Sequence, residues 1–124
     1  MRRLVGAVAG GKGDFGRWIA RLQDHYARKT GLRLYPGTLN VHLAEEYRLP
    51  AGCLRLEGVE YGGRVNVNLV RCSIFGRPAF ILRTDLNEKG AGDHPRNVVE
   101  VASDLNLRQT YRLKDGSLVE IEVE

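Results

Sequence analysis

Apolar and polar positions follow two different periods along this chain. Over residues 17–31, apolar side chains recur at the three- and four-residue spacing of an amphipathic helix, and Gly31 is placed to end it. From residue 38 onward the period changes to two, which is typical of half-buried strands. The pattern therefore predicts a helix over residues 17–31. It predicts strands over residues 3–9, 38–43, 53–61, 64–75, 78–83, 98–102 and 117–123.

Turn residues predict how these segments are joined. Tyr35-Pro36-Gly37 fits a turn before the second strand, because proline presets φ and glycine permits a tight bend. Gly62-Gly63 fits a hairpin turn between the third and fourth strands, and Asp115-Gly116 fits a turn into the last one. Most connections are therefore of hairpin length, which favours antiparallel pairing.

The last third of the chain contains a long polar loop and a second helix. Residues 86–97 form a loop of about 12 residues, and loops of that length in compact domains are often functional. A short helix is expected over residues 103–111, with Ser103 or Asp104 as its N-cap.

Together these elements predict a mainly β fold with two helices. Short alternating strands are best protected when the sheet closes into a barrel, because closure removes exposed edges. A length of 124 residues suits one domain with one core, so we expect a single domain over residues 1–124.

The composition narrows the class of protein. Hydrophobic residues make up 43% and charged residues 27%, as in an ordinary soluble globular protein. No apolar run approaches the roughly 20 residues of a membrane helix, and the start of the chain is a poor secretory signal. We expect a cytoplasmic monomer without a membrane partner. Cys53 and Cys72 are expected to be reduced, buried thiols, because Cys and His are too few and too scattered for a zinc site.

Positive charge is concentrated in the first third of the chain. Residues 1–43 hold eight Lys and Arg against two Asp, whereas residues 44–124 hold eleven against thirteen Asp and Glu. The basic part suits an anion such as a nucleotide phosphate or nucleic acid, and a solvated basic face is the alternative.

Gly11, Gly13 and Gly16 have the G-x-G-x-x-G spacing of a dinucleotide-binding turn. That assignment also needs a βαβ unit and an acidic residue about 20 positions later, yet no acid lies between Thr30 and Ala44. Closely spaced glycines before a helix can still cradle phosphates with backbone N–H groups. Taken alone, the loop fits phosphate binding and a turn that only needs positive φ equally well.

Thr38 and Asn40 are two apart on a predicted strand, so their side chains share one face. Hydroxyl and amide oxygens can ligate a hard cation such as Mg²⁺, which often takes only one or two protein ligands. Ordinary strand polarity is the alternative. His42 shares the same face, and for it a packing role is favoured.

Here the sequence resembles a known family. GxGxFGRW followed by GLRLYPGTLNVHL, and later HPRNVVEVASDLNLRQTYRLKDGSLVEIEV over residues 94–123, is similar to the archaeal CTP-dependent riboflavin kinases. The motifs keep the family order along nearly the whole chain, although residues 53–83 match only as a strand pattern. The resemblance implies a six-stranded cradle-loop β-barrel that transfers the γ-phosphoryl of CTP to the 5′-hydroxyl of riboflavin, giving FMN and CDP.

The resemblance also implies a role for individual residues. Mg²⁺ would bind Thr38 and Asn40. Riboflavin would bind Glu100, with Gly92 and His94 as further flavin-binding candidates, and Glu100 would accept or orient the ribityl hydroxyl proton. CTP would be bound by the glycine loop and by the late helix: Gly11, Lys12, Gly13, Asp14, Phe15, Gly16, Arg17, Leu105, Asn106, Leu107 and Arg108.

Three departures from the family pattern concern mainly the acceptor. The glycine loop carries one extra residue at Phe15, and Gly92 stands where the family usually has a threonine that contacts the FMN phosphate. An Ile-Ala-Pro segment of the family appears as Val101-Ala102-Ser103. Gly92 favours a second hypothesis, a regulatory module that binds nucleotide or flavin without chemistry. Nucleic-acid binding is a third hypothesis, and we do not expect it because no aromatic stacking platform is evident.

Overall fold

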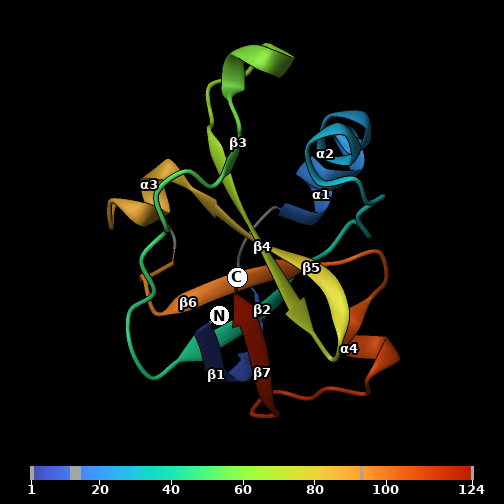
Figure 1. Ribbon diagram of the computed structural model, residues 1–124, viewed down its shortest axis with the longest axis vertical. Coiled ribbons are helices and arrows are strands. Elements are labelled where there is room, and N and C mark those ends of the chain that lie inside the picture. Colours follow the sequence, from blue (N-terminus) through green and yellow to red (C-terminus); the bar gives the residue numbers. More distant parts are fainter. Residues whose placement is uncertain (1, 12–14, 93, 124) are drawn as a thin grey trace.

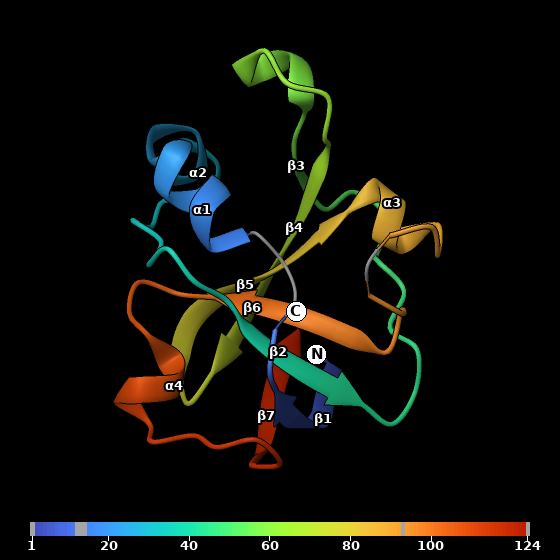
Figure 2. The same ribbon diagram turned by 180° about the vertical axis from the view of Figure 1, so that it is seen from behind.

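The computed structural model describes residues 2–11, 15–92 and 94–123, and six of its strands close into an antiparallel barrel (Figures 1 and 2). The ring returns to its starting strand because β7 pairs with both β1 and β4, so the predicted barrel is confirmed. A further strand, β3 (Leu54–Leu56), pairs with β4 outside the ring. Around the ring the strands run β4 (Val67–Ile74), β5 (Arg77–Thr84), β6 (Val98–Ala102), β2 (Leu39–Leu43), β1 (Arg2–Ala9) and β7 (Leu118–Val123).

The barrel is filled by its own side chains. Alternate residues of each strand point inward, so Val41, Val101 and Ile121 have no exposed surface and lie in one apolar cluster. In a barrel of six strands this packing leaves no room for a ligand. A binding site must therefore lie on the outside.

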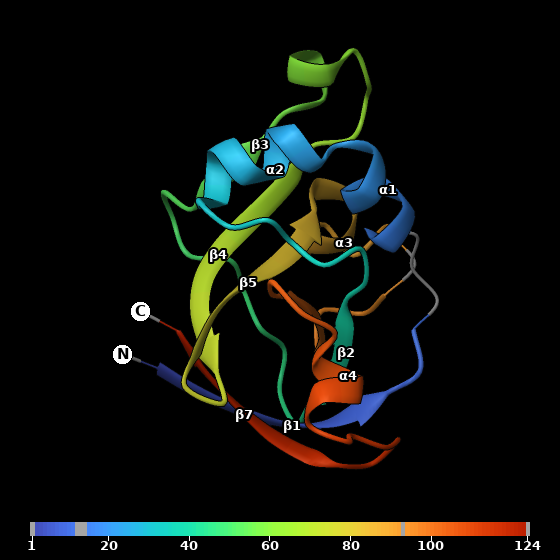
Figure 3. The same cartoon turned by 90° about the vertical axis from the view of Figure 1, so that its right-hand side faces the viewer.

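A second apolar layer covers part of that outside. Helices α1 (Phe15–Arg21) and α2 (Gln23–Thr30) lie across the barrel, as Figure 3 shows from the side. Their buried residues, such as Ile19 and Tyr26, pack against outward-facing residues of β4, β5 and β6. This cover explains why all five residues of β6 are buried.

The predicted helical regions are present with different boundaries. The segment expected as one helix over 17–31 forms α1 and α2, which are separated by Leu22, and Gly31 ends the second helix in the left-handed conformation. The late helix α4 (Leu107–Thr110) begins after the predicted caps, because Asn106 accepts a hydrogen bond from the backbone of Gln109. An additional short helix, α3 (Asp85–Glu88), starts the loop predicted over 86–97.

One strand prediction was wrong. The segment 53–61 forms only the three-residue β3, followed by the 3₁₀ helix η1 (Gly58–Tyr61). Glu57 and Glu60 form a capping box that starts η1, and a Cβ on Gly58 would lie 2.7 Å from the carbonyl oxygen of Gly63. These local contacts replace the expected Gly62-Gly63 hairpin turn with a longer projection. We call residues 57–66 the arm; it extends beyond the barrel in Figure 1.

Both cysteines carry free thiols. Cys72 is buried in the barrel, where burial raises the pKa of its thiol to about 12, whereas Cys53 is half-buried at the outer sheet. In the part of the chain that the structure describes, no helix has the length and apolar character to cross a membrane.

Candidate active site

Two buried polar residues face each other on the covered outer side of the barrel. Asn40 of β2 is 6% exposed and Glu100 of β6 is 4% exposed, and they are direct partners in the antiparallel register. Their strand neighbours Val41 and Val99 point into the barrel, so alternation sends Asn40 and Glu100 outward. Figure 2 shows β2 and β6 running side by side below α1.

Glu100 also contacts residues that lie far away in the sequence. Thr38, directly before β2, donates a hydrogen bond of 2.8 Å from its Oγ1 to Glu100 Oε1. On the other side, His94 Nε2 lies 3.7 Å from Glu100 Oε2, and both side chains are at most 10% exposed. A carboxylate in such an apolar place is costly to bury unless it is hydrogen-bonded, and the bond from Thr38 offsets part of this cost.

An aromatic cavity of about 280 Å³ opens beside Glu100. It lies between helices α1 and α2, the arm and the segment after β5, with a polar end formed by His94 and Glu100. Burial raises the pKa of Tyr26, and the nearby Tyr61 and Glu100 raise it further, so the Tyr26 hydroxyl stays protonated. The aromatic side chains that line the cavity are Phe15, Trp18, Tyr26 and Tyr61.

A smaller cavity of about 180 Å³ lies on the other side of Thr38. It is formed by residues 35, 37–39, 101 and 105–108. Thr38 lines the smaller cavity and Glu100 lines the aromatic cavity, so the hydrogen bond between them connects the two linings. Two ligands in these cavities would approach each other at this pair.

Two glycines at the ends of the glycine loop, Gly11 and Gly16, lie against Asn40 and Pro36. A Cβ on Gly11 would lie 2.3 Å from Nδ2 of Asn40, and a Cβ on Gly16 would lie 2.9 Å from the carbonyl oxygen of Pro36. At Gly16 the neighbour is backbone, so only glycine allows this approach, whereas at Gly11 the neighbour is the side-chain amide of Asn40. Gly11 and Gly16 therefore have a packing reason for lacking a side chain, and they bring the two ends of the loop next to the site. The predicted residues Lys12, Gly13 and Asp14 lie outside the described residues.

The residues expected to hold Mg²⁺ fit a hard cation. Asn40 Oδ1 is buried and has no hydrogen-bond partner among the residues that the structure describes, so an oxygen ligand is left over. The Thr38 hydroxyl uses its proton toward Glu100, which leaves its lone pairs for a cation. Within the described ranges, no group of three or more His, Cys, Asp or Glu could hold a metal. A cation here would therefore depend on phosphate oxygens and water for its other ligands.

The remaining predicted residues fall on both sides of this centre. The smaller cavity is lined by four of the residues predicted to bind CTP, Leu105, Asn106, Leu107 and Arg108. Phe15, which was also predicted to bind CTP, lines the aromatic cavity instead. Arg108 Nη2 forms an exposed ion pair of 2.6 Å with Asp115. Arg17 and His42 are exposed, on α1 and on β2.

Gly92 lines the aromatic cavity beside α3. A Cβ at this position would lie 1.7 Å from Oδ1 of Asn87. The Asn87 amide therefore occupies the space that a side chain at position 92 would take.

Comparison with known proteins identifies the family. A family model of CTP-dependent riboflavin kinases, which carries the description "domain of unknown function DUF120", matches residues 8–123. The chain belongs to this family. Because the match spans the glycine loop, both cavities and the last strand, the resemblance inferred from the motifs is confirmed.

Curated relatives carry the name riboflavin kinase. One from Methanopyrus kandleri is 31% identical over 128 residues, covering 96% of this chain and 81% of the relative. One from Staphylothermus marinus is 25% identical over 122 residues, covering 96% of the chain and 89% of the relative. One from Methanospirillum hungatei is 32% identical over 136 residues, covering 97% of the chain and 57% of the relative. The chain is therefore one of a family of kinases.

Sequence reasoning missed the aromatic cavity of this family member. Tyr26 appeared to be a helix residue of the core, and Tyr61 appeared to end a strand. Both line the cavity, together with Val65 of the arm. The capping box of Glu57 and Glu60 starts with a glutamate rather than the usual Ser or Thr, so the sequence pattern did not point to a 3₁₀ turn at this position.

Proposed function

We propose that the protein transfers the γ-phosphoryl group of CTP to the 5′-hydroxyl of riboflavin, giving FMN and CDP. The observation that carries this proposal is the hydrogen bond between Thr38 and Glu100, which connects two cavities of different character. A phosphoryl transfer between two small molecules needs such an arrangement, because donor and acceptor must meet in line at one point.

The aromatic cavity is proposed to hold riboflavin. Its four aromatic side chains suit the flat, apolar isoalloxazine ring, while Glu100 and His94 at its polar end suit the ribityl chain. In this orientation the 5′-hydroxyl would point toward Thr38 and the smaller cavity.

The smaller cavity is proposed to hold the cytidine of CTP. CTP as the donor is supported by the family to which the chain belongs, and Asn106 and Arg108 in the lining are side chains that can hydrogen-bond to a base or sugar. The triphosphate would extend past Thr38 and Asn40 toward the glycine loop, where backbone N–H groups and a helix start favour anions.

The chemical step follows from these positions. The 5′-hydroxyl oxygen of riboflavin attacks the γ-phosphorus of CTP, the bond from that phosphorus to the bridging oxygen breaks, and CDP leaves. Glu100 accepts the hydroxyl proton, and Thr38 holds the carboxylate in place. Thr38 and Asn40 are the proposed ligands of Mg²⁺, which would supply charge stabilisation to the triphosphate.

A product assay tests this proposal. The protein is incubated with riboflavin and Mg²⁺, with CTP in one series and ATP in another, and FMN is quantified by chromatography. We expect FMN with CTP only, and no turnover by Thr38→Ala at an unchanged circular dichroism spectrum. Equal rates with ATP would refute the donor assignment, and full activity of Thr38→Ala would refute the metal assignment.

A binding module on the same barrel is the second candidate. It is favoured by Gly92, which lines the aromatic cavity. The Asn87 amide occupies the space that a side chain at position 92 would need. Titration calorimetry that detects binding of riboflavin or CTP, without FMN in the product assay, would favour this candidate over the kinase.

A further inference from the structure

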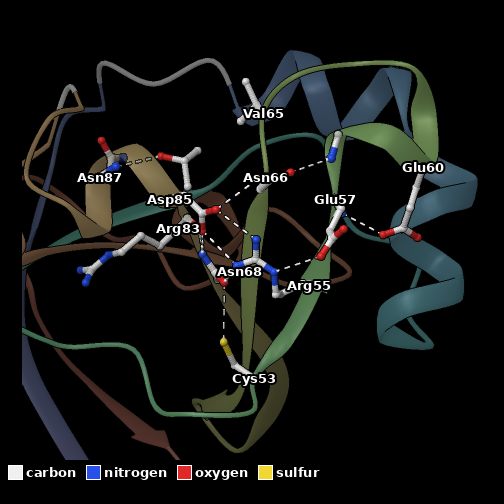
Figure 4. A network of polar contacts seen from close by, with 12 residues as sticks. Cys53, Arg55, Glu57, Glu60, Val65, Asn66, Asn68, Arg83, Asp85 and Asn87 are labelled. Atoms are coloured by element: carbon white, nitrogen blue, oxygen red, sulfur yellow. Dashed lines mark hydrogen bonds and ion pairs between the residues drawn. The ribbon is translucent and has the colours of Figure 1, made fainter.

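A cluster of polar side chains around Asp85 lies beside the aromatic cavity without lining it (Figure 4). Arg55 makes two parallel contacts with the Asp85 carboxylate, from Nη1 to Oδ1 and from Nη2 to Oδ2, each of 3.0 Å. Asn68 Nδ2 donates to Oδ1 at 2.8 Å, and Asn66 Nδ2 donates to Oδ2 at 3.3 Å. Four donors thus converge on one carboxylate, and such charge-assisted bonds are stronger than neutral ones.

The cluster joins elements that are distant in the sequence. Asp85 begins α3, Arg55 belongs to β3, and Asn68 belongs to β4. Asn66 is at the end of the arm, where its backbone carbonyl accepts from Asp85 N at 3.1 Å and its Oδ1 accepts from Gly58 N at 2.9 Å. Through these bonds Asp85 connects both ends of the arm to α3.

The far end of the arm is attached to α2 instead. Lys29 Nζ of α2 forms an ion pair of 2.9 Å with Glu60, and the ring of Tyr61 lies 6.2 Å between centroids from that of His25, also on α2. The arm therefore spans the opening between α2 and α3. Figure 4 shows the Asp85 cluster at its base and Glu60 near its tip.

Both elements that Asp85 connects form walls of the cavity. The arm contributes Tyr61 and Val65, and the segment that begins with α3 contributes Leu86 and Asn87. We infer that Asp85 is a positioning residue for the acceptor: by fixing the arm against α3, its carboxylate sets the width of the aromatic cavity. This inference rests on the proposed function, because it takes the cavity to be the riboflavin site.

The Asp85 cluster holds its carboxylate with more hydrogen bonds than an isolated surface ion pair does. An exposed Lys or Arg pair contributes little, but here a bidentate guanidinium and two amides act on the same carboxylate. The Arg55 hydrogen bonds, with those of Asn68 and Asn66, lower the pKa of Asp85 to about 2. The carboxylate therefore stays ionised at every pH at which the enzyme would work.

Asp85→Asn tests the inference with little change in shape. Glu120→Gln is the matched control, because Glu120 lies on β7, lines neither cavity and forms an exposed ion pair with Arg3 of β1. Amide hydrogen exchange is measured over residues 57–66 and over β1. Riboflavin affinity is measured by quenching of Trp18, the only tryptophan, which lines the cavity.

We expect Asp85→Asn to exchange faster in the arm but not in β1, and Glu120→Gln to match the wild type in both. The Kd and KM for riboflavin should rise about fivefold or more in Asp85→Asn, with kcat and the KM for CTP within about twofold. This split separates positioning of the acceptor from a general loss of structure, which would change all of these quantities.

Several results would overturn the inference. Unchanged exchange in the arm would show that Asp85 does not fix it, and faster exchange with unchanged riboflavin affinity would show that the arm does not set the cavity. If β1 also exchanges faster, the milder Arg55→Lys, which keeps the charge but loses the parallel contacts, is measured in the same way. A wild-type protein that neither binds nor phosphorylates riboflavin overturns the proposed function instead, and hydrogen exchange alone then decides whether Asp85 fixes the arm.

Discussion

Replacing Glu100 with glutamine is the sharpest test of the proposed chemistry. The substitution removes a negative charge and keeps the shape of a side chain that is only 4% exposed. The amide oxygen of glutamine can still accept the hydrogen bond that Thr38 now donates to Oε1 at 2.8 Å. The fold should therefore be retained while the ability to accept a proton is lost.

The two expected effects differ strongly in size. A positioned general base contributes about 10²–10⁴ in rate, so kcat should fall about 100-fold or more, equivalent to about 2.7 kcal/mol or more of transition-state stabilisation. The free energy of unfolding should change by less than about 1 kcal/mol, because the Thr38 bond is kept and the cost of burying a charge is relieved. Loss of activity should thus occur without loss of stability.

The assay compares kcat at saturating riboflavin and CTP with urea unfolding of the same samples. Glu120→Gln is the control, since it also removes one carboxylate but from an exposed position on β7. A Glu100→Gln protein that keeps more than about a tenth of wild-type kcat would refute the reasoning, because a residue with that effect is not a general base. In that case Glu100 only orients the hydroxyl.

Three other predictions concern the metal, the glycine loop and acid stability. Asn40→Ala should leave the fold intact, because Oδ1 has no partner within the described chain, and should raise the Mg²⁺ concentration for half-maximal activity about tenfold or more in a metal titration. Gly16→Ala should lower the free energy of unfolding in urea by about 1–3 kcal/mol, because its Cβ would lie 2.9 Å from the Pro36 carbonyl oxygen; an unchanged value would contradict this packing role. The pKa of Asp85 is lowered to about 2 by Arg55, so its contribution is complete above about pH 4 and is lost as the pH falls toward 2. After a reduction for partial exposure we expect about 1–2 kcal/mol between those limits in wild type, and a flatter pH profile in Asp85→Asn.

The barrel could be predicted because its strands follow the alternating pattern closely. The strand 98–102 was predicted with the bounds of β6, since four of its five residues are apolar and the flanking segments are polar. The arm could not be predicted in the same way. Residues 53–61 alternate as well, but the capping box of Glu57 and Glu60 and the close packing of Gly58 favour a 3₁₀ turn, and local hydrogen bonds of this kind override a weak period.

The site was only partly accessible to sequence reasoning. Thr38 and Asn40 could be placed on one face because their positions are two apart along a strand, with Leu39 between them. Their contact with Glu100, 62 residues from Thr38, depends on the register between β2 and β6, which no local pattern encodes. The aromatic cavity also requires α1 and α2 to cross the barrel and the arm to face them, so it arises only from the tertiary arrangement.

The position of the site follows from the size of the barrel. Six strands leave an interior that side chains fill completely, so polar residues that act on a ligand must point outward. An outward carboxylate on a bare barrel would be hydrated and unable to hold a defined position. The cover of α1 and α2 buries Glu100, and the same cover forms the walls of the aromatic cavity beside it. Burial of the proposed base and formation of the proposed acceptor site are therefore two consequences of one packing event, which is why the residues beneath these helices combine an apolar layer with the Glu100 carboxylate.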